Sequence, residues 1–213
     1  MKIIDDIDQQ SPEWFKLRLG SIGGSSIASV VAGGQGKTRK SLLYRKAGEL
    51  LSGTTYESYS NAHMERGIEQ EDDARIAYQW ETDNDVVQVA LCQSDQPFKH
   101  YSPDGLVSTI FDGIIEIKCV IPSVHVETII SDKVPAAYRK QIQWGLHICE
   151  REWCDFVSYS PLVGARPIWI KRVERDEKLI KELDQGADKF ITELLLIVNK
   201  IKLDHLGIRE TYN

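Results

Sequence analysis

The sequence predicts a mixed α/β (α+β) fold in which a central mixed β-sheet lies between layers of helices. Two patterns carry this prediction: the order of segments, from helices through a β-rich part to a last helix, and an apolar run at 113–121 that is typical of a central strand. With 213 residues and 42% hydrophobic composition, the chain can bury one substantial core. We therefore expect a single domain over 1–213, with a helical part at about 11–80, a sheet-containing core at about 86–173 and a C-terminal helix at about 176–202.

Turn and capping signals divide the first part of the chain into helices. Ser11, Pro12 and Glu13 form the pattern of an N-cap, a first-turn proline and an early acid, and Gly20 ends the short helix that they begin. The other features predicted for this part are a helix that starts within 21–26, a glycine-rich break at 33–36, a helix at about 38–51, a polar loop at 54–61 and a longer helix at about 65–80.

The β-rich part consists of apolar and β-branched runs that are bounded by turn residues. The predicted strands lie at 86–92, 101–108, 113–121, 153–159 and 167–173, and one helix is predicted at about 135–148. Phe111, Asp112 and Gly113 form a hairpin signal between the second and third of these strands.

The composition argues for an intracellular protein with reduced thiols. No stretch approaches the roughly 20 apolar residues that span a bilayer, so we expect a cytoplasmic protein without membrane contact. Cys92, Cys119, Cys149 and Cys154 have no paired C-x-x-C spacing. We expect buried free thiols, and an iron–sulfur cluster is the alternative.

The net charge of −6 argues against a protein that coats nucleic acid nonspecifically, because such binding depends on neutralising phosphates. It does not exclude a nuclease, in which positive charge can be confined to one channel. A local basic excess of that kind occurs at Lys37, Arg39, Lys40, Arg45 and Lys46, although a solvated helix face would have the same pattern.

Glu116 and Lys118 interrupt the apolar run at 113–121. Side chains alternate along a strand, so both charges project from the face that carries Ile114 and Val120. Unpaired charges are costly to bury, so something must offset them. One interpretation is an ion pair between the two residues or with neighbours. The other is that Glu116 holds a divalent cation, while Lys118 polarises the attacking water or stabilises charge on a phosphate.

Asp104 lies twelve residues before Glu116, in the segment Ser-Pro-Asp-Gly at 102–105. Together the two segments form the PD-(D/E)xK nuclease motif, which predicts a restriction-endonuclease-like core with Asp104 as a second oxygen ligand. Magnesium favours a few carboxylates with water and substrate phosphate. A strict two-residue turn at 112–113 would pair Thr109 with Glu116 and put Asp104 on the opposite face, so we expect a bulge or a longer loop.

A third acid comes from the helix predicted at about 65–80. On a helical wheel, Glu71 falls within the arc of Ile68, Ala74 and Tyr78, so it points toward the apolar side. An inward glutamate could pair with Arg75 one turn later. Because two other acids are available, we favour a role in holding a metal or positioning water.

These motifs resemble those of the lambda-exonuclease or YqaJ-type viral recombinase family, which belongs to the PD-(D/E)xK nucleases. The resemblance covers about 14–178, and the matching blocks occur in the family's order. The blocks are 14–20 followed by Ser25, then 71–75, 102–106, 116–119 and 137–143.

The resemblance implies catalytic roles for individual residues. Glu71, Asp104 and Glu116, with the carbonyl oxygen of Ile117, would hold the metals, and Lys118 would be the catalytic lysine. The implied cofactor is Mg²⁺, with two ions and with Mn²⁺ as a possible substitute.

The resemblance also implies a DNA-binding set. Arg18, Ser25 and Gln141 would bind the phosphate at the 5′ end, Ser102 would contribute to the DNA contacts, and Met64 would part the duplex ends. The alternatives stay open: an ordinary helix cap at Ser25, a buried structural hydrogen bond at Gln141 and a core position for Met64.

The resemblance further implies a phage-type recombination enzyme in the cytoplasm of a bacterial host. Such an enzyme would be a ring-shaped homotrimer that resects the 5′-ended strand of linear duplex DNA, leaving a 3′ overhang for a single-strand annealing recombinase. The alternatives are a restriction or junction-resolving endonuclease and a noncatalytic DNA-binding accessory protein.

Two departures from the family pattern qualify these roles. The interval from Asp104 to Glu116 is one or two residues longer than expected, so Asp112 is a rival for the metal position. The loop at 54–61 also aligns poorly, which affects contacts between subunits and with entering DNA.

Overall fold

The computed structural model describes residues 1–32, 36–55, 62–107 and 112–205, with the backbone but not the side chains at 62–69 and 204–205. The helices in this part are α1 (Pro12–Leu17), α2 (Gly24–Val30), α3 (Lys37–Ser52), α4 (Ala62–Thr82), α5 (Pro122–Ser131), α6 (Ala136–Ile148) and α7 (Glu177–His205). The strands are β1 (Lys2–Ile4), β2 (Val86–Val87), β3 (Leu91–Gln93), β4 (His100–Tyr101), β5 (Gly105–Val107), β6 (Gly113–Cys119), β7 (Trp153–Tyr159) and β8 (Ile168–Glu174).

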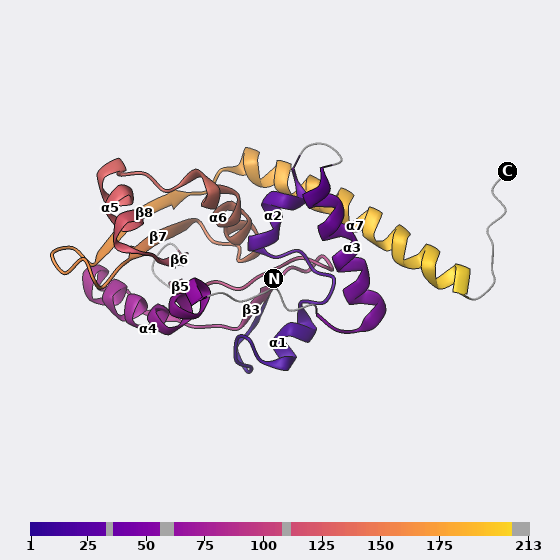
Figure 1. Ribbon diagram of the computed structural model, residues 1–213, viewed down its shortest axis with the longest axis horizontal. Helices are drawn as coiled ribbons and strands as arrows, with labels where there is room; N and C mark the ends of the chain where they lie inside the picture. The colour runs from indigo at the N-terminus through magenta and orange to yellow at the C-terminus, as the bar shows by residue number, and fades with distance from the viewer. Residues whose placement is uncertain (33–35, 56–61, 108–111, 206–213) are drawn as a thin grey trace.

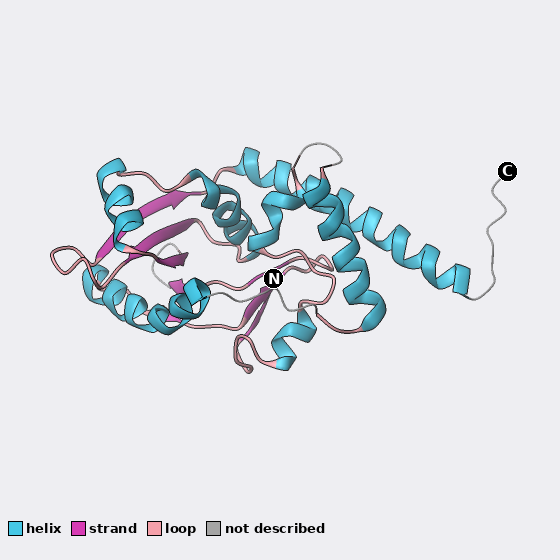
Figure 2. Ribbon diagram, in the orientation of Figure 1, coloured by secondary structure: helices cyan, strands magenta, loops and turns pink. Residues whose placement is uncertain are grey.

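The main sheet is mixed, with the strand order β2-β5-β6-β7-β8. Strands β6 and β7 are parallel because α5 and α6 connect them as a crossover, and every other pair in this sheet is antiparallel. Helix α4 contacts β6, β7 and β8, while α6 contacts β6 and β7 across the sheet (Figure 1). The expected arrangement of a sheet between helical layers is confirmed (Figure 2).

The two faces of β6 pack into two different cores. Ile115 and Ile117 join the cluster beneath α4, which includes Ala74 and Tyr78. Ile114 joins the larger cluster formed with α2, α3, α6 and α7. Alternation along the strand therefore directs the even-numbered residues, Glu116 among them, toward the face that α6 covers.

Local capping signals account for several helix boundaries. The hydroxyl of Ser11 accepts a hydrogen bond from the Trp14 amide at 3.2 Å, and Pro12 begins α1. Gly53, with φ of +70°, ends α3 in the left-handed conformation that glycine adopts without strain. Helix α7 is the long amphipathic helix expected at the end of the chain, and it packs on α3 and α6.

Two strands that we predicted as continuous are each split between two sheets. The segment 86–92 forms β2 and β3, and the segment 101–108 contributes β4 and β5. Strands β1, β3 and β4 form a separate three-stranded sheet. Pro103 explains the second break, because proline cannot donate to the strand ladder. Strand β1 and helix α5 are elements that the sequence analysis did not predict.

The hairpin before β6 has a longer connection than a two-residue turn. Val107 pairs with Gly113 and Gly105 pairs with Ile115, so five residues connect β5 to β6. Extending this register by one residue sets Asp104 opposite Glu116 on the same face of the sheet. The prediction of a longer loop is confirmed by this register, while residues 108–111 lie outside the described residues. The break predicted at 33–36 and the loop predicted at 54–61 lie largely outside them as well.

Candidate active site

Glu116 is buried at the centre of the candidate site, with 1% of its surface exposed. Three donors from different elements converge on its carboxylate. The Gln141 amide of α6 donates to Oε1 at 2.5 Å, the Tyr101 hydroxyl of β4 donates to Oε2, and the Lys118 ammonium forms an ion pair with Oε1. A carboxylate with this many charge-stabilising partners can stay buried without unfolding the strand.

Asp104 lies where the pairing between β5 and β6 stops. Its Oδ2 accepts a hydrogen bond from the Ile117 amide at 2.6 Å, so the aspartate side chain satisfies a backbone donor of β6 beyond the end of the pairing with β5. Burial raises the pKa of Asp104 to about 8, and the charges of Glu116 and Glu71 add to this effect. The carboxyl group of Asp104 is therefore protonated more readily than that of an exposed aspartate.

Lys118 is the cation of this group. Its Nζ donates to the carbonyl oxygen of Ile117 at 3.0 Å and lies 5.5 Å from the centre of the Tyr138 ring. Burial alone would lower its pKa, but the neighbouring Glu116 and Asp104 outweigh burial and raise it. Lys118 therefore remains protonated at neutral pH. The ion pair that we considered between Lys118 and Glu116 is present, and it lies beside Asp104 and Gln141.

Glu71 approaches from α4, where its Oε1 pairs with Nη2 of Arg75 at 2.7 Å. The ion pair that we considered as an alternative is therefore formed. Nε of Arg75 also donates to the Asp104 carbonyl oxygen at 2.9 Å, which ties α4 to the turn before β5. Burial raises the pKa of Glu71, against the opposing charges of Arg75 and Lys118. Glu71 thus lies near Asp104, Glu116 and Lys118, and Arg75 holds its carboxylate.

The oxygen atoms available here suit a hard divalent cation. Asp104, Glu116 and the Ile117 carbonyl supply the kind of oxygen ligands that magnesium prefers. Among the described residues, no group of three or more His, Cys, Asp or Glu side chains is arranged to hold a metal ion. Protein donors occupy Glu116, and Glu71 turns to Arg75. The set still fits magnesium, which keeps several waters.

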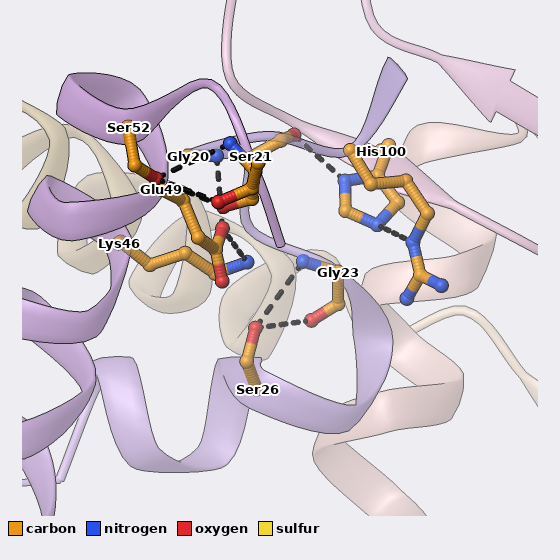
Figure 3. Close-up of polar contacts among 10 residues, drawn as sticks. Gly20, Ser21, Gly23, Ser26, Lys46, Glu49, Ser52 and His100 are labelled. Carbon is orange, nitrogen blue, oxygen red and sulfur yellow. Dashed lines mark hydrogen bonds and ion pairs between the residues drawn. The ribbon is translucent and has the colours of Figure 1, made fainter. Parts of the chain in front are cut away.

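A basic pocket of about 150 Å³ lies beside this site. It is lined by Arg18, Ser25, Arg45 and Lys46, among other residues. Glu49 also lines the pocket, and Figure 3 shows its contacts: its Oε2 accepts from Lys46 Nζ at 2.9 Å and from the Gly20 amide at 3.0 Å. The positive charges of the pocket therefore have a buried counter-charge.

The residues predicted to bind the 5′ phosphate are divided between the pocket and the acidic site. Arg18 and Ser25 line the pocket, whereas Gln141 donates to Glu116. Ser25 is exposed and is not the helix cap: Gly23 occupies that position, and Ser26 hydrogen-bonds to its backbone (Figure 3). A Cβ atom on Gly24 would lie 3.2 Å from Cγ of Gln141, so the start of α2 is close to the acidic site.

Three other predicted residues have different outcomes. The Ser102 hydroxyl accepts a hydrogen bond from the Trp14 indole at 3.2 Å. Met64 lies in α4, but its side chain is outside the described residues. Asp112 pairs with Arg151 at the start of β6, and four residues of extended strand separate it from Glu116 by roughly 13 Å. The structure therefore removes Asp112 as a rival ligand.

The basic residues at 37–46 do not share a single role. Arg39 forms a bidentate ion pair with Glu193 on α7, with both N···O distances at 2.8 Å. Lys46 is held by Glu49, while Lys37 and Arg45 line a larger hollow of about 530 Å³ between α2 and α3. Part of the run therefore joins helices, and part faces the pocket region.

Sequence reasoning missed Tyr101, His100 and Glu49. Tyr101 and His100 directly precede the Ser-Pro-Asp-Gly segment, and this closeness to Asp104 was the sequence signal that could have indicated them. Their contacts depend on residues far away in the sequence. Burial and the adjacent Glu116 raise the pKa of Tyr101 well above its ordinary value, so its hydroxyl stays a donor.

Three of the four cysteines lie in the larger core cluster. Cys92, Cys149 and Cys154 are buried free thiols, as expected, and Cys119 is half-buried. None of the helices in the described part is both long and apolar enough to cross a bilayer.

Comparison with known proteins gives a consistent family. The YqaJ-like viral recombinase domain matches residues 13–152. An alkaline exonuclease (LHK-Exo) from Laribacter hongkongensis has a similar structure, with a TM-score of 0.85 and 34% sequence identity. The match covers 93% of this chain and 100% of that chain, and the structure of LHK-Exo in complex with dAMP gives the same values. A phage related exonuclease from Haemophilus somnus 129PT shares the fold, with a TM-score of 0.60 and 16% identity, covering 85% and 96% of the two chains. No curated protein matches significantly.

The family match covers more than half of the chain, and the exonuclease of known structure is similar over nearly all of it. The chain therefore belongs to the YqaJ-like viral recombinase domain family, and it is an exonuclease of the lambda-exonuclease type.

Proposed function

We propose that the protein is a metal-dependent 5′→3′ exodeoxyribonuclease that resects one strand of linear duplex DNA and leaves 3′ overhangs. One observation carries the proposal: the buried Glu116 and the partly buried Asp104 and Lys118 lie beside a basic pocket that Arg18 lines. Acidic ligands suit the cleavage of a phosphodiester, and a nearby cationic pocket suits the terminal phosphate of the same strand.

The acidic group would hold the catalytic ions. Glu71, Asp104, Glu116 and the Ile117 carbonyl are the proposed ligands. The chemistry that divalent ions supply in such a site is polarisation of the phosphate and a lowered pKa for the attacking water. Two Mg²⁺ ions, replaceable by Mn²⁺, match this ligand set.

The chain's own residues would position the reacting groups. Lys118, which stays protonated, orients the attacking water and stabilises negative charge that develops on the phosphate. Gln141 and Tyr101 hold the carboxylate of Glu116 in one orientation through hydrogen bonds to its two oxygens. Arg18 in the pocket would bind the 5′ phosphate and thereby set the position of cleavage from the end of the strand.

The test uses linear duplexes with one labelled strand and either 5′-phosphate or 5′-hydroxyl ends, with magnesium, manganese or EDTA. We expect loss of the 5′-ended strand only, faster from phosphorylated ends, and no loss in EDTA. Lys118→Met should reduce kcat by at least about a hundredfold, because it removes a charge that acts in the transition state.

The matched control is Lys171→Met, which removes a lysine that pairs with Asp132 on the surface and should retain wild-type activity. Cleavage of closed circular DNA would favour the endonuclease interpretation. Absence of any cleavage would contradict the catalytic proposal. The homotrimeric ring and the annealing partner stay predictions from the resemblance, which sedimentation of the purified chain, alone and with an annealing protein, would test.

A further inference from the structure

The guanidinium group of Arg18 is held on two sides. It stacks on the Trp14 ring, with Cζ 3.6 Å from the ring centre, and its Nε donates to Nε2 of His100 at 2.9 Å. Trp14 is itself fixed, because its indole nitrogen donates to the Ala90 carbonyl at 2.9 Å and to the Ser102 hydroxyl at 3.2 Å. The plane and the rotation of the guanidinium group are therefore both determined by protein contacts.

The contact between Arg18 and His100 determines the tautomer of the imidazole. Arginine Nε can only donate, so Nε2 of His100 must be an unprotonated acceptor. The proton of a neutral ring is then on Nδ1, which lies 2.7 Å from the Ser21 hydroxyl oxygen and donates to it (Figure 3). A protonated imidazolium would have no acceptor for Arg18.

The surroundings of His100 favour this neutral form. The side chain is buried, and burial with the nearby charges of Arg18 and Lys46 lowers its pKa well below the ordinary value. Glu49 is the acid among the charged groups of this pocket, and it is hydrogen-bonded to Lys46 and Gly20. The ring therefore stays an acceptor across the neutral pH range.

The position of the ring is fixed by the backbone and by the space around it. The His100 amide donates to the Ile22 carbonyl at 3.0 Å, and the His100 carbonyl accepts from the Trp144 indole at 3.1 Å. A Cβ atom on Gly23 would lie 2.5 Å from Nε2 of His100, so only glycine leaves room for the ring. Segments far apart in the sequence thus place one acceptor nitrogen at the edge of the pocket.

This geometry determines which donors of Arg18 remain for a ligand. Nε is used by His100, and among the described residues the two terminal amino groups of Arg18 have no hydrogen-bond acceptor. Two such groups are the donors that bind two oxygens of one phosphate. They belong to a side chain that lines the pocket with Ser25 and Arg45.

We propose that His100 is a positioning residue: with its proton on Nδ1, which faces Ser21, its Nε2 accepts from Arg18 and so presents the two terminal amino groups of Arg18 to the 5′-terminal phosphate of DNA. This inference rests on the proposed function, in which Arg18 binds that phosphate. His100 acts through Arg18 and does not contact the reacting atoms. Its effect is therefore expected in the preference for phosphorylated ends and not in the chemical step.

Two substitutions separate the two nitrogens of the ring. His100→Gln can place an amide oxygen where Nε2 was, and so keeps an acceptor for Arg18. His100→Asn reaches only the position of Nδ1, and so keeps the partner of Ser21 but loses the acceptor. His147→Asn is the control, because this half-buried histidine pairs with Asp184 on α7.

The readout is the ratio of kcat/KM for 5′-phosphate over 5′-hydroxyl duplex ends, at saturating magnesium. We expect His100→Asn to lower this ratio by at least about tenfold, as the loss of one hydrogen bond from a charged donor would predict. The loss should be in KM for phosphorylated ends, with kcat nearly unchanged. His100→Gln should retain most of the ratio, and His147→Asn should retain all of it.

The outcomes distinguish this inference from the proposed function. A wild-type enzyme without preference for phosphorylated ends would remove the phosphate role of Arg18, and this inference with it. A wild-type preference that His100→Asn leaves intact would overturn the role of His100 alone. If the asparagine variant does not fold, ¹⁵N spectra of histidine-labelled wild-type protein decide: an unprotonated Nε2 from pH 6 to 9 supports the inference, and a protonated Nε2 overturns it.

Discussion

Replacement of Glu49 by glutamine should destabilise the protein by about 2 to 3 kcal/mol at pH 7. Glu49 is 3% exposed, and its Oε2 accepts from Lys46 Nζ and from the Gly20 amide. Glutamine keeps the shape and one acceptor oxygen but removes the charge that opposes Lys46. Breaking a buried pair costs about 3–5 kcal/mol, and the 13% exposure of the Lys46 side chain reduces this because the ammonium can partly rehydrate.

The pH dependence of this loss has a definite sign. Burial already lowers the pKa of Lys46, and Glu49 opposes that effect. In Glu49→Gln the pKa of folded Lys46 falls further, so the folded state binds fewer protons than the unfolded state between that pKa and about 10.4. Stability then rises with pH across this window. The difference from wild type should therefore be largest at neutral pH and shrink toward pH 10.

The assay is urea denaturation of both proteins at pH 7 and at pH 9.5, with the slope of each transition compared to exclude a change in the unfolded state. Lys46→Met in the Glu49→Gln background should recover part of the loss, because it removes the unpaired cation. A loss below about 0.5 kcal/mol at pH 7, or a loss that stays constant with pH, would refute the argument that the charge of Glu49 stabilises Lys46.

Two further predictions concern packing and a buried hydrogen bond. Gly145→Ala should lower the free energy of unfolding by about 1–3 kcal/mol in thermal unfolding, because the new Cβ atom would lie 2.6 Å from Cζ of Tyr101. The control Gly48→Ala adds a Cβ atom that faces open space on α3, so it should raise the free energy of unfolding by roughly 0.5–1 kcal/mol. Equal effects of the two substitutions would contradict the steric argument. Tyr78→Phe should cost about 1.5–3 kcal/mol in urea denaturation, because the hydroxyl donates to the buried Asp155 carboxylate at 2.8 Å, and a neutral result would show that Asp155 finds another partner.

The sequence predicted the central strand and one face of the site because both depend on local patterns. An apolar run with two charges at even spacing predicted that Glu116 and Lys118 would share a face, and they do. The helix boundaries at Ser11 and Gly53 followed from capping chemistry that involves only neighbouring residues.

The sequence was less informative where the chain changes sheet. The runs at 86–92 and 101–108 have strand composition throughout, so their division between two sheets could not be read from periodicity. The face on which Asp104 lies depended on the length of the loop before β6, and one residue more or less would have reversed it. We could predict the longer loop only because Asp104 and Glu116 had to meet.

The sequence by itself determined the fold class, the motif residues and the family, because strand alternation, helix capping and ordered motifs are properties of short segments. Only the tertiary structure decided that Gln141 and Tyr101 hold Glu116, that Glu71 pairs with Arg75, and that His100 orients Arg18. Most of these contacts join residues that are 15 to 82 positions apart. Such contacts form because packing the helices against the sheet brings donors and acceptors together in an interior without water, where each must find a partner. No local sequence pattern specifies which partner that will be.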